Sequence, residues 1–159
     1  MDFTNDNQTH ISRVEQQDYF ALTILWDEQK EPAKHYGFYF QETGLLEFST
    51  PWESNHIQKM VLVLCRDFEV IHSKLPAIKN AEPVLACIDG RDHVDVDMLK
   101  TIVYSDGLII QLAAGVPVKT FQYGNVYFMT DNENKPLRIQ ISNMSDAAVA
   151  HTVRELTCA

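Results

Sequence analysis

Apolar residues between Ser54 and Leu75 recur at intervals of three and four positions, which is the spacing of one face of an α-helix. Further apolar residues widen that face, so the pattern predicts a long helix buried in the middle of the domain. Ser54 or Asn55 can cap its first turn, and Pro76 ends it because proline has no backbone N–H to donate. The run from Met60 to Cys65 alone is also typical of a buried strand, but the longer pattern favours the helix.

Short alternating or apolar runs predict strands on both sides of this helix. Two pairs of runs read as hairpins, around Gly44 and around Gly124, and a final helix is expected to begin at Ser145. A short helix is expected to end at Gln17, and residues 97–105 fit either a short helix or the start of a strand. The predicted strands cover residues 19–26, 36–41, 45–49, 84–88, 108–112, 118–123, 126–130 and 137–141.

These elements predict one α+β domain, in which a mostly antiparallel β-sheet packs around the central helix at about Ser54–Leu75 and a second helix lies at the C-terminus. The polar residues 1–8 are expected to be flexible, and residues 9–159 to form the domain. A chain of 159 residues suits a single core of this kind.

Charge and cysteine content narrow the choice of partner and compartment. The net charge of −9 opposes nucleic-acid binding, because that binding requires basic residues to displace counterions from phosphates. No run approaches the roughly 18 apolar residues of a membrane helix, and no signal peptide is recognisable at the N-terminus. Three cysteines, an odd number without a close pair, favour a reducing cytoplasm.

The densest polar cluster runs from Asp89 to Asp97. If residues 93–97 are extended, His93, Asp95 and Asp97 share one strand face and could hold a divalent metal, which predicts a metal-dependent hydrolase. Three ligands so close on one strand seldom converge on one ion, and the spacing is not that of a calcium loop. The alternative is a solvated turn, because Asp commonly builds turns and helix caps.

No catalytic residue, cofactor site or metal site is assigned in the main interpretation. The sequence has no Gly-rich phosphate loop and no metalloprotease or serine-hydrolase motif. Cys65 and His72 would lie roughly 10 Å apart along a helix, which is beyond hydrogen-bond reach.

The aromatic and acidic residues around the first hairpin predict a protein interface, because aromatic anchors carry much of the binding energy at interfaces. The main hypothesis is therefore a small acidic cytosolic interaction protein, such as an inhibitor, an immunity protein, an antitoxin or a secretion chaperone, whose acidic surface suits a basic partner. A further alternative is a small-molecule sensor with a pocket between the long helix and the aromatic hairpin. The predicted partner-binding residues are Trp26, Asp27, Glu28, Glu31, Tyr39, Glu42, Trp52, Asp92 and Asp95.

Overall fold

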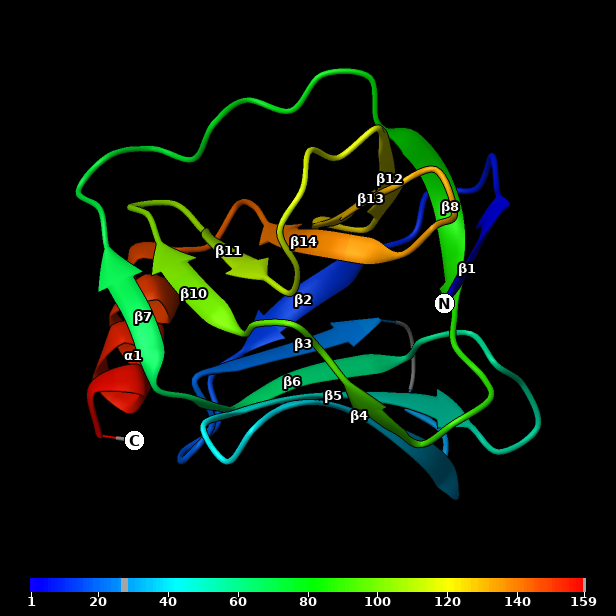
Figure 1. The fold of residues 1–159 in the computed structure, drawn as a ribbon, viewed down its shortest axis with the longest axis horizontal. Coiled ribbons are helices and arrows are strands. Elements are labelled where there is room, and N and C mark those ends of the chain that lie inside the picture. Colours follow the sequence, from blue (N-terminus) through cyan, green and yellow to red (C-terminus); the bar gives the residue numbers. More distant parts are fainter. Residues whose placement is uncertain (27–28, 159) are drawn as a thin grey trace.

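Two β-sheets face each other in the computed structural model, which describes residues 1–26 and 29–158, and one helix closes an end of the molecule (Figure 1). The larger sheet has, in spatial order, β1 (Asp2–Asn5), β8 (Glu82–Cys87), β12 (Lys119–Tyr123), β13 (Val126–Thr130), β14 (Pro136–Ile141), β11 (Leu108–Gln111), β10 (Lys100–Val103) and β7 (Asp67–Val70). The smaller sheet has β2 (Ser12–Glu15), β3 (Leu22–Trp26), β6 (Lys59–Cys65), β5 (Gly44–Pro51), β4 (Ala33–Phe40) and β9 (His93–Asp95). The helix is α1 (Asp146–Cys158).

The predicted central helix at Ser54–Leu75 is wrong, and with it the predicted α+β arrangement around that helix. This stretch instead forms β6 and β7, and the described residues are mostly strand with two mixed sheets and a single C-terminal helix. β6 lies between β3 and β5, where Met60 and Leu62 are fully buried and Val61 is only 6% exposed. A strand buried on both faces is a continuous apolar run, and such a run can satisfy helical spacing by chance.

One smaller element also differs from the expectation. The short helix that was expected to end at Gln17 is the strand β2. Of the two alternatives for residues 97–105, the strand is the one observed, as β10. Residues 2–5, at the N-terminus, form β1 and pair antiparallel with β8.

Local turn signals predicted several elements correctly. The hairpins around Gly44 and Gly124 are confirmed as β4–β5 and β12–β13, each paired antiparallel. The C-terminal helix is also confirmed, and the Ser145 hydroxyl caps it by accepting a hydrogen bond from the Ala148 N–H at 3.1 Å.

The core fills the space between the two sheets and is closed by an aromatic pair. Trp26 of β3 stacks on Tyr123 of β12, with ring centroids 4.8 Å apart. The Trp26 indole N–H donates to the Tyr123 carbonyl at 2.9 Å, and the Tyr123 hydroxyl donates to the Ile57 carbonyl at 2.7 Å. Both side chains are fully buried, so their polar atoms are paired inside the core.

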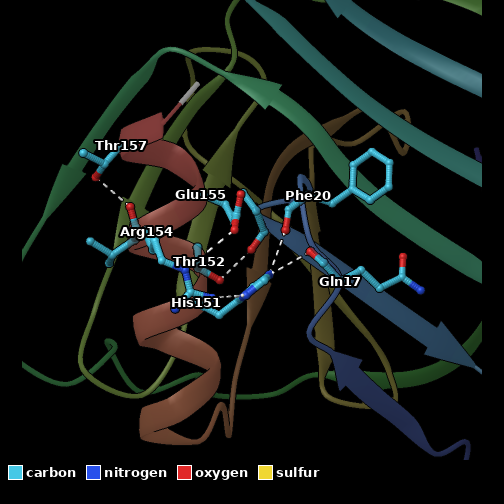
Figure 2. A network of polar contacts seen from close by, with 9 residues as sticks. Gln17, Phe20, His151, Thr152, Arg154, Glu155 and Thr157 are labelled. Atoms are coloured by element: carbon cyan, nitrogen blue, oxygen red, sulfur yellow. Dashed lines mark hydrogen bonds and ion pairs between the residues drawn. The ribbon is translucent and has the colours of Figure 1, made fainter.

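Hydrogen bonds to the turn between β2 and β3 fix α1 in place (Figure 2). His151 is 4% exposed, and its Nε2–H donates to the carbonyls of Gln17 and Phe20, each at 3.0 Å. Its Nδ1 therefore accepts from the Arg154 guanidinium at 2.9 Å. The Thr152 hydroxyl donates to the Ala21 carbonyl at 2.7 Å. Among the described residues no helix is long and apolar enough to cross a membrane.

Candidate functional site

The most exposed tryptophan marks one end of the β4–β5 hairpin. Trp52 directly follows β5 and is 63% exposed, whereas most large aromatic side chains of the described chain are buried or half-buried. Its backbone N–H donates to the Pro32 carbonyl at 3.0 Å, which holds it opposite the start of β4. The indole is thus an exposed apolar surface on a hydrogen-bonded backbone, as expected of an interface anchor.

An acidic depression lies on one side of Trp52. It has a volume of about 320 Å³, and the exposed residues Glu31 and Glu53 contribute to its lining. Pro32 and Pro51 supply apolar surface beside the indole, and Lys30 is the basic residue of the lining. This depression combines an apolar floor with carboxylates at its border.

A larger groove lies on the other side of Trp52. The short strand β9 pairs in parallel with residues 37–39 of β4, and the segment that precedes β9 diverges from the rest of β4. The resulting opening measures about 800 Å³, and we call it the β4 groove. It is lined by Ala33, Lys34, His35, Tyr36, Trp52, Gly90, Arg91, Asp92 and His93.

Two cations of the β4 groove, Lys34 and Arg91, form no ion pair with any residue that the structure describes. Lys34 is half-buried and Arg91 is exposed, and neither makes an ion pair or a side-chain hydrogen bond with the described residues. The two histidines of the groove do have acidic neighbours, because His35 lies 3.4 Å from Glu47 and His93 lies 3.1 Å from Asp95. Within the described residues the groove therefore carries two cations outside any ion pair, in a chain of net charge −9.

The structure divides the predicted partner-binding residues between several places. Trp26 is fully buried in the core, so its side chain has no surface to offer. Glu42 lies in the turn of the β4–β5 hairpin, at the opposite end from Trp52, and eight strand residues separate the two ends by roughly 25 Å. Tyr39 also lies toward that far end and stacks on His93 with centroids 4.1 Å apart.

Of the remaining predicted residues, Glu31 and Asp92 line the two depressions beside Trp52. Asp95 is exposed in β9 and borders a different cavity. Asp27 and Glu28 lie outside the described residues. Lys34 and Arg91 were not predicted, because nothing in the local pattern brings positions 34 and 91 to one groove.

The His93–Asp97 cluster is assembled only in part. His93 and Asp95 lie on the same side of β9 and contact each other at 3.1 Å, as the strand spacing predicts. Asp97 instead accepts a hydrogen bond from the Lys135 ammonium at 3.2 Å. Among the residues that the structure describes, no three His, Cys, Asp or Glu side chains are grouped closely enough to hold a metal ion.

A smaller cavity of about 300 Å³ opens between the two sheets beside β9. Phe38, Ile88 and Leu112 are buried residues that contribute apolar surface to it. The Asp97–Lys135 ion pair and Arg91 stand among its polar lining groups. A cavity with an apolar floor and a few charged groups at its border is the usual form of a small-molecule site.

The two buried cysteines are not suited to nucleophilic chemistry. Burial raises the pKa of the Cys65 thiol, and the hydrogen bond that Thr101 donates to its sulfur at 3.3 Å offsets this only in part. Burial also raises the pKa of Cys87, with the nearby carboxylates of Asp2 and Asp89 acting in the same direction. Both groups stay protonated near neutral pH, where a reactive cysteine needs a thiolate.

Comparison with known proteins assigns neither a family nor a function to the chain. No protein family model matches the chain, and no curated protein sequence is significantly similar to it.

Proposed function

We propose that this protein is a small acidic interaction protein that binds a protein partner through the surface around Trp52. Inhibitors, immunity proteins, antitoxins and secretion chaperones are the classes to which such a function belongs. The observation that carries the proposal is the 63% exposed indole of Trp52, which stands between two depressions on a hydrogen-bonded stretch of backbone. Exposed tryptophans that a partner can enclose are among the strongest contributors to binding.

The charges around Trp52 support a partner with a mixed surface. Glu31 and Glu53 on one side suit basic groups of a partner. An acidic surface was expected from the sequence, and these two residues are the part of it beside Trp52. Lys34 and Arg91 on the other side suit acidic groups. Glu42 and Trp26 are not part of the proposed surface.

Site-specific crosslinking tests the proposal. A photoreactive amino acid at position 52 is expected to crosslink one partner in the native host, and the same amino acid at Ile11, which is 76% exposed, is not. Trp52→Ala is expected to weaken capture of that partner about 30-fold, since hot-spot tryptophans contribute 2 kcal/mol or more. Equal crosslinking from both positions, or unchanged capture by Trp52→Ala, would contradict the proposal.

A second candidate function is small-molecule binding in the cavity between the sheets. Its support is the apolar floor of Phe38, Ile88 and Leu112 beside the Asp97–Lys135 ion pair. Ligand-observed NMR with a fragment library is expected to identify binders that Leu112→Phe, which fills the cavity, no longer binds. Fragments that bind both proteins equally would contradict this function.

The cytoplasm is the compartment that we propose for this protein. Cys65, Cys87 and Cys158 are all free thiols, and free thiols persist in reducing compartments.

A further inference from the structure

Part of the edge of β4 borders the β4 groove without a neighbouring strand from the described residues. β9 pairs only with residues 37–39, so the edge from Ala33 to Tyr36 borders the groove directly. An unpaired strand edge carries a row of N–H and C=O groups that can accept another strand. Among the described residues, no other segment pairs with this part of β4 on that side.

The hydrogen bonds of β4 show which backbone groups face the groove. The Gly37 N–H donates to the Asp92 carbonyl and the Tyr39 carbonyl accepts from the Val96 N–H, each at 2.8 Å. The backbone N–H and C=O groups of the odd-numbered residues of β4 therefore face β9. The Pro32 carbonyl accepts from the Trp52 N–H, so the backbone groups of the even-numbered residues face β5. Because backbone groups alternate along a strand, Ala33 and His35 present their N–H and C=O groups to the groove.

The charges of the groove indicate what kind of strand would lie there. Lys34 is a half-buried residue, and its ammonium makes no ion pair with the residues that the structure describes. Arg91 also lines the groove and makes no ion pair within the described part of the chain, and Asp92 is the one acid among the groove's lining residues. A carboxylate on an incoming segment would supply the charge that Lys34 and Arg91 lack.

We propose that the β4 groove binds an extended segment of a partner protein that carries carboxylate side chains, by adding it as a strand to β4. Ala33 and His35 form the main-chain hydrogen bonds, Lys34 and Arg91 pair with carboxylates, and Trp52 covers an apolar side chain of the segment. This inference rests on the proposed protein-binding function and names the mode of binding and the chemistry of the bound segment.

Two short peptides of opposite charge test the charge preference. The probe is acetyl-Val-Glu-Val-Glu-Val-amide, and its twin has lysine in place of glutamate. At about 0.15 M salt, where screening confines charge effects to about 8 Å, we expect the acidic peptide to bind at least about tenfold tighter. Equal affinities, or tighter binding of the lysine peptide, would overturn the proposal.

A matched pair of protein variants locates the bound peptide. Lys34→Gln is expected to weaken the acidic peptide about fivefold. Lys79→Gln makes the same change of net charge at an exposed lysine outside the β4 groove and is expected to leave the affinity unchanged. Equal losses in the two variants would show a general charge effect and overturn the assignment to the groove.

N-methylated peptides test the strand pairing itself. A strand added to β4 uses the N–H groups of only one of its edges, so methylation of the glutamate amides and methylation of the valine amides should differ. The series whose methylated amides face β4 is expected to lose at least about tenfold in affinity, because methylation removes its pairing donors. The other series keeps those donors, and its affinity is expected to stay within about twofold. Equal effects of the two series would overturn strand addition.

The outcomes separate this inference from the proposed function. If Trp52→Ala abolishes capture of the native partner while the two methylated series behave alike, protein binding stands and strand addition is wrong. If the peptides bind as expected while Trp52→Ala captures the partner normally, strand addition stands, whereas the Trp52-centred function and the contact of Trp52 with the segment are wrong.

Discussion

At the scale of single residues, the two tryptophans have opposite environments. Trp26 is fully buried and stacks on Tyr123, whereas Trp52 is 63% exposed. We expect acrylamide to quench part of the native fluorescence, and we expect Trp52→Phe to remove the quenched part, because the remaining indole is inaccessible. If acrylamide quenches the fluorescence of Trp52→Phe as strongly as that of the wild type, Trp52 is not exposed, and the proposed function depends on that exposure.

The buried thiol of Cys65 is expected to make the free energy of unfolding depend on pH in the alkaline range. Its pKa is raised in the folded protein above the ordinary value of 9.0, because burial disfavours the thiolate. As the pH rises, the Cys65 thiol therefore loses its proton in the unfolded chain before it does so in the folded protein. The contribution of this thiol to the free energy of unfolding is complete below about pH 9 and declines as the pH rises toward the pKa of the folded state.

Urea unfolding at pH 8 and pH 10 measures this effect. We expect the free energy of unfolding to fall more steeply between these two pH values in the wild type than in Cys65→Ala, which has no group to ionise at that position. Identical pH dependences would contradict the raised pKa.

At the scale of elements, α1 depends on His151 for its attachment. Figure 2 shows the ring between the helix and the turn that carries Gln17 and Phe20. We expect His151→Ala to lower the free energy of unfolding by about 1–3 kcal/mol, because two carbonyls at a buried contact lose their donor. Chemical denaturation measures the loss.

Thr157→Ala is the matched control on the same helix. The Thr157 hydroxyl is exposed and donates to the Val153 carbonyl within α1, so its removal is expected to change stability by less than about 0.5 kcal/mol. A His151→Ala variant as stable as Thr157→Ala would show that the helix is held by apolar packing alone.

The elements also show which parts of the fold could be predicted from the sequence. The hairpins around Gly44 and Gly124 and the helix capped by Ser145 depend on residues close in the chain, so their signals are local. The identity of β6 depends on tertiary structure, because β3 and β5 pair with its two edges and the side chains on both of its faces are buried. Its composition alone therefore matched a buried helix as well as a strand.

The candidate site could be predicted only in part for the same reason. Trp52, Glu31 and Asp92 were expected from their chemical type, and the structure places them near one another around the start of β4. Lys34 and Arg91 line the same groove because β9 pairs with β4 although strands of both sheets lie between them in the sequence. No local pattern encodes that pairing.

At the scale of the whole molecule, Tyr123 of the larger sheet stacks on Trp26 of the smaller sheet, and its hydroxyl donates to the connection between β5 and β6. We expect Tyr123→Phe to lower the free energy of unfolding by about 1–3 kcal/mol, because the Ile57 carbonyl would lose a buried donor without any change in ring packing. Trp26 fluorescence during urea unfolding measures the change, because its indole stacks on the altered ring. A variant as stable as the wild type would show that the Tyr123 hydroxyl adds nothing to the stability of the core.

The smaller sheet is built mostly from the N-terminal part of the chain, and this determines which part of the protein can fold first during synthesis. Five of its strands, β2 to β6, lie between Ser12 and Cys65, so they can pair before most of the larger sheet has been synthesised. The apolar face of this early sheet then stays uncovered until β8 and β10 to β14 arrive. Nascent chains that end shortly after Cys65 should therefore be bound by chaperones, and that binding should end once residues up to Ile141 are available.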